Sequence, residues 1–178
     1  ARAFKGVQKI ITIPNGVAVL ADGYWAAKQG RDALAVQWDL GANASLDSAK
    51  VSAMLGDAAT KAAAVAVEKG DAAAVAKLSA SYEVPYLAHA CMEPLNCLAW
   101  VKGDEVTIWA GTQSQGPAQG ILSQVAQATP AKVKVNTLLL GGGFGRRFAP
   151  DFTIDATLLS KLSGSPVKLI YTREDDMA

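Results

Sequence analysis

The chain has 178 residues, of which 51% are hydrophobic and 19% are charged, and its formal net charge is +1. This length is enough for one domain, or two small ones, with a sizeable buried core. The near-neutral charge argues against a nucleic-acid or strongly acidic partner, and no apolar run reaches the roughly 18 residues of a membrane span.

Residues 1–42 predict a compact α/β unit. The β-branched run Val7–Ile13 and the run 17–21 read as two strands, and Asn15-Gly16 between them favours a hairpin turn. Asp22 is a candidate cap for a helix over Tyr24–Leu34. A third short strand at Val36–Trp38 completes the unit. The side chains expected on the buried face of the helix are Trp25, Ala26, Ala27 and Leu34.

Residues 43–80 are rich in alanine and predict a helical connection. Ser45 or Asp47 can cap a helix to about Leu55, where Gly56-Asp57 interrupts it. The stretch 60–68 fits either helix or strand, and Gly70-Asp71 predicts the start of another helix to about Leu78. Because alanine has the highest helix propensity, plain helical packing is favoured over a repeat or a cofactor-binding motif.

Strand patterns dominate the chain after residue 80. Tyr82–Leu87 predicts a strand with Pro85 at an edge, and 96–101 with 105–110 predicts a hairpin around Gly103. Pro117 fits the first turn of a helix. The expected elements after that helix are a buried strand 133–140, a helix from Asp151 to Leu162, a strand 167–171 and a solvated charged turn containing Asp175-Asp176.

The segment Gly141-Gly142-Gly143-Phe144-Gly145 is the most informative feature of the chain. Four glycines where a strand ends leave a bare backbone that suits a flat or polyanionic ligand, or alternatively a turn built for tight packing. Gln113, with an amide donor and a carbonyl acceptor, follows another strand. We expect the two strand ends to lie side by side and to face a common ligand.

Several other site types are excluded or weakened. The glycines match neither the phosphate-binding loop nor the dinucleotide-binding spacing, and no nucleophile elbow accompanies the lone His89. We therefore expect His89 to be a structural residue and Glu93 to have a hydrogen-bonding role. Cys91 and Cys97 could form a disulfide, but two buried, reduced thiols are the favoured interpretation.

These motifs resemble those of a known family. Trp109-x-x-Thr112-Gln113, followed 31 residues after the glutamine by the phenylalanine of the glycine segment, resembles the molybdenum-binding large subunit of the xanthine oxidase family. The segments 85–97, 143–147 and 173–177 are most similar to the β-subunit type of isoquinoline 1-oxidoreductase and its bacterial aldehyde-dehydrogenase relatives. Residues 1 to about 40 resemble the end of the family's hammerhead domain.

The resemblance implies an α+β fold with mixed sheets and packed helices. Residues 1–42 would be the C-terminal part of the hammerhead unit, and 81–178 the first part of a molybdenum-cofactor-binding domain. It implies a fragment of a subunit that hydroxylates an N-heterocyclic aromatic or an aldehyde with Mo-bound hydroxide. The cofactor would be molybdenum-molybdopterin in its cytosine dinucleotide form, and electrons would pass to a small partner subunit with [2Fe–2S] clusters, in the bacterial cytoplasm or periplasm.

By the same resemblance, Gln113, Gly143, Phe144 and Gly145 would bind the cofactor, without a direct metal ligand among them. Phe148 stands where purine-oxidising members have a glutamate, so it would belong to the pocket of a more apolar substrate. The family's general-base glutamate has no counterpart here, and we expect the 178 residues alone to be inactive. The alternatives are a non-catalytic α/β binding or assembly module, and an anion-binding protein that uses Arg146-Arg147.

Overall fold

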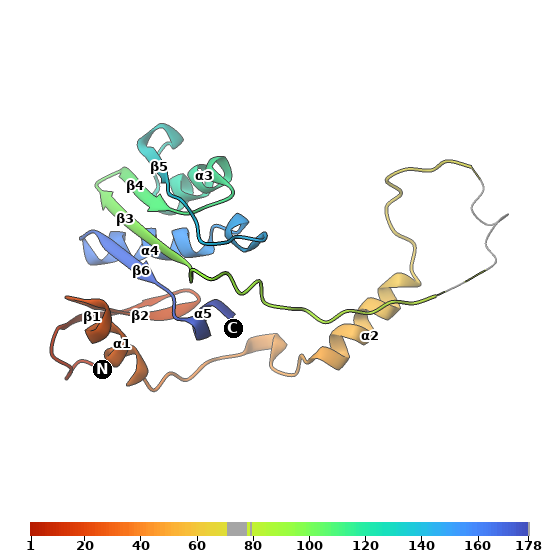
Figure 1. Cartoon of the computed structure of the whole chain (residues 1–178), viewed down its shortest axis with the longest axis horizontal. Coiled ribbons are helices and arrows are strands. Elements are labelled where there is room, and N and C mark those ends of the chain that lie inside the picture. Colours follow the sequence, from red (N-terminus) through yellow and green to blue (C-terminus); the bar gives the residue numbers. More distant parts are fainter. Residues whose placement is uncertain (71–77, 79, 178) are drawn as a thin grey trace. The chain divides into compact units, whose positions relative to one another are not determined.

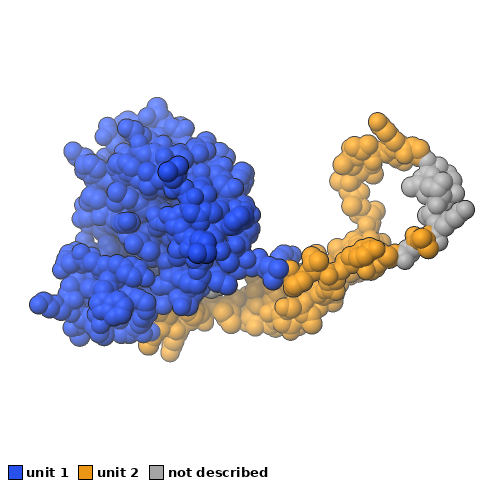
Figure 2. Space-filling model, viewed as in Figure 1, with its two compact units in different colours: residues 1–34, 86–178 blue, residues 35–85 orange. Residues whose placement is uncertain are grey.

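The computed structural model describes residues 1–70, 78 and 80–177. The chain divides into two units, one of residues 1–34 and 86–178 and one of residues 35–85, which are described separately (Figure 2). The helix expected to start at Gly70-Asp71 lies outside the described residues.

The larger unit contains a four-stranded sheet with the strand order β5-β4-β3-β6 (Figure 1). Strands β3 (Asn96–Lys102) and β4 (Glu105–Ala110) form the expected antiparallel hairpin, and Gly103 takes a φ of +63° in its turn. Strand β5 (Val133–Thr137) pairs parallel to β4, whereas β6 (Val167–Ile170) pairs antiparallel to β3. The sheet is therefore mixed, as expected.

Two helices cover one face of this sheet. Helix α3 (Gln115–Ala126), followed by the short 3₁₀ turn η2 (Pro130–Lys132), connects β4 to β5. Helix α4 (Asp151–Ser163) precedes β6. Alternate residues of β3 and β4 face the helices, as the period of a strand requires. The fully buried core side chains include Cys97, Ala99, Val106, Ile108, Leu122, Phe152 and Ala156.

A second small sheet packs on α4. Strands β1 (Val7–Ile13) and β2 (Gly16–Ala21) form the expected hairpin, and α1 (Tyr24–Asp32) lies against it. The helix approaches closely because Gly30 has no side chain: a Cβ there would lie 2.9 Å from methyl groups of Val7 and Val19. Ile13, Leu159 and Val167 form the small core that joins this hairpin to α4 and β6.

The smaller unit contains the 3₁₀ turn η1 (Gly41–Asn43) and helix α2 (Ser48–Ala59). Asp47 caps α2, as expected, because its carboxylate accepts a hydrogen bond from the Lys50 N–H at 2.8 Å. The helix continues through Gly56-Asp57 to Ala59, so the expected end at Leu55 was wrong. Residues 60–68 form neither the helix nor the strand that their sequence allowed.

Three expected strand segments are absent or shorter in the described part of the chain. Val36–Trp38 and Tyr82–Leu87 form no strand, and β5 ends at Thr137 rather than at Leu140. The side chains beyond β5 are not buried either, since Leu139 is 99% exposed. A β-branched or apolar run becomes a strand only where a partner strand is available, and sequence periodicity does not reveal the partner.

Two burial predictions were also wrong. Trp25 lies on the outer side of α1 and is 66% exposed, although its helix was predicted correctly to within two residues. Conversely, the expected solvated turn 173–177 is the short helix α5 (Arg173–Met177), and the Asp176 side chain is only 2% exposed. The α+β fold class is confirmed. None of the helices within the described ranges is long and apolar enough to cross a membrane.

Candidate cofactor-binding site

The candidate site lies where two parallel strands end. Ala110, the last residue of β4, is paired with Thr137, the last residue of β5, and the Leu138 N–H donates to the Ala110 carbonyl at 3.0 Å. Parallel neighbours present their carboxyl ends at the same edge of a sheet, which is where open α/β sheets form their ligand crevices. The polar segment 111–114 and the glycine segment 141–145 therefore leave the sheet together.

Gln113 and the glycine segment are in direct contact. The Gly145 N–H donates to Oε1 of Gln113 at 3.2 Å. A Cβ at Gly143 would lie only 2.5 Å from the same Oε1, so glycine is required there for the amide to approach the main chain. The structure thus brings together the two strand ends that the sequence predicted would face a common ligand.

The backbone of the glycine segment is held in left-handed conformations. Gly142 and Gly145 each have a φ of +99°, and Phe144, between them, has a φ of +53°, which is uncommon for a residue with a side chain. The Phe144 ring is 75% exposed. Among the hydrogen bonds of the described residues, none uses the N–H of Gly142, Gly143 or Phe144. The turn therefore presents main-chain donors next to an aromatic ring.

Arg147 lies beneath the glycine segment and is completely buried. Its Nε donates to the Gly142 carbonyl at 2.7 Å, and its Nη1 donates to the Gly111 carbonyl at 3.3 Å. Its Nη2 donates to both the carbonyl and the carboxylate of Glu93, at 2.8 and 2.9 Å. Arginine carries five N–H donors in one plane, so a single side chain connects three separate segments.

Glu93 completes this connection from the other side. Its Oε2 accepts the Gly141 N–H at 2.7 Å, its Oε1 accepts the Asn96 amide at 2.8 Å, and its own N–H donates to the Gly141 carbonyl at 3.1 Å. Partial burial would raise the pKa of the Glu93 carboxyl, but these two hydrogen bonds and the Arg147 charge outweigh it and lower the pKa. The expected hydrogen-bonding role of Glu93 is confirmed.

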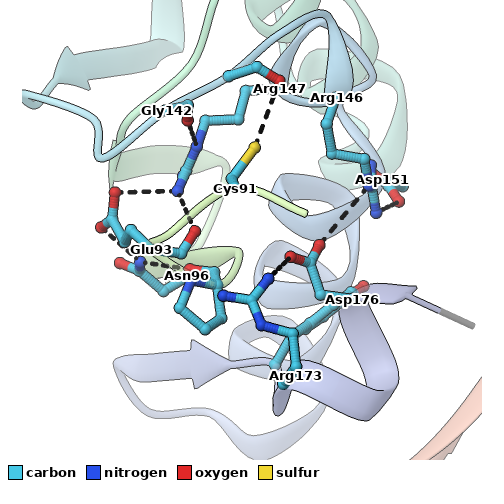
Figure 3. A network of polar contacts seen from close by, with 12 residues as sticks. Cys91, Glu93, Asn96, Gly142, Arg146, Arg147, Asp151, Arg173 and Asp176 are labelled. Atoms are coloured by element: carbon cyan, nitrogen blue, oxygen red, sulfur yellow. Dashed lines mark hydrogen bonds and ion pairs between the residues drawn. The ribbon is translucent and has the colours of Figure 1, made fainter. Parts of the chain in front are cut away.

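The neighbouring Arg146 belongs to a separate ion-pair network (Figure 3). It forms a bidentate pair with Asp151 at 2.8 and 3.0 Å and lies 3.7 Å from Asp176. Arg173 in turn contacts Asp176 at 3.3 Å and donates to the Met92 carbonyl at 3.0 Å. Both adjacent arginines are thus paired with carboxylates, which argues against an anion site built from Arg146-Arg147.

Cys91 and His89 lie close to the glycine segment, whereas Cys97 lies in β3. Both cysteines are buried free thiols, as expected, and the Cys91 thiol donates to the Gly143 carbonyl at 3.4 Å. His89 is exposed, which contradicts the expectation of a satisfied structural residue; its Nε2 would lie 3.6 Å from a Cβ at Gly145. The described residues contain no group of three or more His, Cys, Asp or Glu side chains arranged to hold a metal ion.

Phe148 ends the 3₁₀ turn η3 (Arg146–Phe148) that follows the glycine segment. Its carbonyl accepts the Ser114 hydroxyl at 2.6 Å, while its ring is mostly exposed. The backbone of this residue is therefore tied to the segment that contains Gln113. The Phe148 ring follows the glycine segment closely in the sequence, and it is accessible from solvent.

Comparison with known proteins identifies the family of the chain. The family model described as "Molybdopterin cofactor-binding domain" matches residues 53–178. The chain belongs to this family. The expected family relationship is therefore confirmed, and the matched residues include every hydrogen-bonding group of the site described above.

Individual relatives of the chain are oxidoreductases by name. The chain is 37% identical over 173 residues to the membrane-bound aldehyde dehydrogenase [pyrroloquinoline-quinone] of Gluconacetobacter polyoxogenes, covering 93% of this chain and 22% of that protein. It is 29% identical over 192 residues to the isoquinoline 1-oxidoreductase subunit beta of Brevundimonas diminuta, covering 99% and 25%. The crystal structure of quinoline 2-oxidoreductase from Pseudomonas putida 86 matches with a TM-score of 0.46 and 22% identity, over 51% of this chain and 12% of that one. The chain thus spans a quarter or less of the length of these relatives.

Sequence reasoning found Gln113 and the glycine segment but missed Arg147. In the sequence, Arg147 is one of two adjacent basic residues, and arginine is usually exposed unless it is paired. The burial of its side chain depends on Glu93, 54 positions away. The one available signal was that Glu93 stands beside Pro94, where a partly buried carboxylate needs a partner.

Proposed function

We propose that this chain supplies part of the molybdenum-cofactor site of a hydroxylase that oxidises an N-heterocyclic aromatic compound or an aldehyde. The observation that carries the proposal is the contact between Gln113 and the bare glycine segment. The Gln113 side chain lies directly against the main chain of this segment, whose four glycines carry no side chains and whose one other residue, Phe144, has an exposed ring. This arrangement suits a ligand that carries oxygen atoms and must be approached by backbone.

The residues present fit such a cofactor. A side chain at Gly143 would occupy the position of the Gln113 amide, and a side chain at Gly142 would meet the Phe144 ring at 3.1 Å. Because the Gly145 N–H is already bonded to Oε1 of Gln113, it fixes the orientation of the amide. The Gln113 Nε2 group would then donate to an oxygen of the cofactor, and the N–H groups of Gly143 and Phe144 would donate to the neighbouring oxygens.

The chain's own role is to bind and orient. When bound, the cofactor supplies the oxygen-transfer and two-electron chemistry, and the protein positions it and provides hydrogen bonds. Preorganised donors are effective because they need no reorganisation during the reaction. The positive φ angles of residues 142, 144 and 145 orient the donors, and hydrogen bonds with the surrounding side chains maintain this conformation before the cofactor binds.

Two observations support the proposed substrate class. Phe148 offers an exposed aromatic ring at the end of η3, next to the site, where an apolar ring or an aldehyde would find a favourable surface. The relatives described above are named for an aldehyde and for isoquinoline. We further propose that the cofactor is the cytosine dinucleotide form and that electrons pass to a partner subunit with [2Fe–2S] clusters. Both proposals rest on the resemblance to the β-subunit type of isoquinoline 1-oxidoreductase.

The full-length protein tests this proposal. Plasma mass spectrometry should find about one molybdenum per chain, and chromatography of the released cofactor should find a pterin dinucleotide. Gln113→Ala should lower the molybdenum content or kcat/KM about 10- to 100-fold, the range for loss of a group that orients a metal centre. Gln119→Ala is a matched control, because Gln119 donates to the carbonyls of Pro130 and Val133, just before and at the start of β5 and therefore at the other end of that strand from the site. Full-length protein that contains pyrroloquinoline quinone and no molybdenum would refute the proposal.

A further inference from the structure

We propose that Arg147 is a positioning residue that sets the distance between Gln113 and the glycine segment. The inference rests on the proposed function, because the two points it positions are those assigned to the cofactor. Arg147 itself is fully buried and does not face the exposed Phe144 ring. Any effect on the cofactor would therefore act through the main chain that Arg147 holds.

The side chain and the main chain of Arg147 both contact the segment that contains Gln113, and the side chain also contacts the glycine segment. The guanidinium holds the carbonyl of Gly142 in the glycine segment and the carbonyl of Gly111, two residues before Gln113. The Arg147 carbonyl accepts the Gln113 N–H at 3.1 Å and the Thr112 hydroxyl at 3.2 Å. One residue thus fixes both the segment that contains Gln113 and the segment that the Gln113 amide contacts.

The contacts of the guanidinium are confined to this site. Among the described residues, its acceptors are the main-chain carbonyls of residues 93, 111 and 142 and the carboxylate of Glu93. Figure 3 shows the contacts to Glu93 and Gly142. An arginine that served only general stability would not need to leave the surface, since removing a charge from water costs several kcal/mol unless it is fully compensated.

The geometry requires arginine rather than any positive charge. The acceptors lie on three segments, and the guanidinium reaches them because its donors spread over a rigid plane. A lysine ammonium donates from a single point at the end of a flexible chain, so Arg147→Lys keeps the charge opposite Glu93 but loses at least one of the carbonyls of Gly111 and Gly142. We therefore expect the conservative substitution to loosen the site without removing the ion pair.

Arg147→Lys in the full-length protein tests the inference. We expect wild-type protein to hold molybdenum and the variant to lose it about 10- to 100-fold faster on dilution, measured as metal per chain after gel filtration. Arg31→Lys is the matched control, because Arg31 is likewise paired with carboxylate side chains, those of Asp32 and Asp175, but lies on α1. Its rate of molybdenum loss should equal that of wild type.

The same substitution made in Gln113→Ala protein distinguishes a positioning role of Arg147 from a role in general stability. If Arg147 acts through Gln113, Arg147→Lys should change the rate of molybdenum loss much less in Gln113→Ala protein than in wild type, because coupled residues are not additive. Equal effects in both backgrounds, or an unchanged rate in the single variant, would overturn the positioning role while leaving the cofactor assignment intact. Wild-type protein without molybdenum would instead refute the proposed function.

A second variant tests the inference if Arg147→Lys does not fold. If Arg147→Lys is unfolded by circular dichroism, Glu93→Gln replaces it, because the amide keeps the shape of the side chain and leaves the three carbonyl contacts of the guanidinium. This variant should lose molybdenum about 2- to 10-fold faster than wild type, a smaller effect than loss of the guanidinium geometry. No acceleration in folded Glu93→Gln protein would count against the inference.

Discussion

Gly143→Ala should separate cofactor binding from folding. The added Cβ would lie 2.5 Å from Oε1 of Gln113, so the amide must move by roughly 1 Å to reach an ordinary contact of about 3.5 Å. That movement breaks the 3.2 Å hydrogen bond from Gly145, which costs about 0.5–1.5 kcal/mol of folding free energy. Because alanine also reduces the entropy of the unfolded chain by about 0.4–1 kcal/mol, the net change in stability should stay within about 1 kcal/mol.

Cofactor retention should respond far more strongly than stability. With the Gln113 amide displaced, the molybdenum content of full-length Gly143→Ala protein should fall about 10- to 100-fold, measured beside its urea denaturation curve. Gly120→Ala in α3 is the matched control, since no atom lies within 4 Å of its added Cβ and a helix favours alanine. Normal molybdenum in Gly143→Ala, or a stability loss of several kcal/mol, would show that the contact has been misunderstood.

Three further predictions concern the fold itself. The pKa of Glu93 in the folded protein is lowered from 4.5, so the ionised carboxylate stabilises the fold fully above pH 4.5 and this stabilisation is lost as the pH falls through the lowered pKa. The stability of the wild-type protein should therefore fall more steeply with decreasing pH in this range than that of Glu93→Gln, measured by acid denaturation. Burial raises the pKa of the Cys97 thiol to about 12, so a thiol reagent at pH 8 should label Cys97 only after denaturation. Ile108→Ala, in the centre of β4, should lower the free energy of unfolding by about 2–5 kcal/mol, measured in urea, and a loss below 1 kcal/mol would contradict the described core.

Local signals in the sequence predicted the elements that position the site. The turn residues at Asn15-Gly16 and Gly103 identified both hairpins, because few residues tolerate the backbone of a tight turn. The two strand ends near Gln113 and Gly143 could be placed together because a strand, a helix and a second strand in succession favour a parallel pair. In each case the information lay within a few residues or in one connection.

The errors arose where the outcome depended on distant partners. Leu138–Leu140 continue an apolar run, but β4 ends at Ala110 and offers them no further residue to pair with. Asp176 looked like part of a solvated charged turn, yet Arg146 and Arg173 bury its side chain. A charged residue can be buried only when its counter-charge is supplied by the fold, and the spacing of charges along the chain does not reveal that pairing.

The glycine segment raises a physical problem that its surroundings solve. Four glycines have large conformational entropy to lose on folding, and they contribute no side chains of their own to hold a defined shape. A preorganised set of donors therefore has to be fixed from outside. A different side chain contacts the main chain of each glycine: Glu93 binds the Gly141 N–H, Arg147 the Gly142 carbonyl, Cys91 the Gly143 carbonyl and Gln113 the Gly145 N–H. Arg147 and Cys91 are fully buried and Glu93 is partly buried, whereas Gln113 is exposed. The buried side chains can therefore fix the shape of the turn while the exposed amide stays accessible, and we predict that mutation separates the rigidity of the turn from the proposed binding of the cofactor.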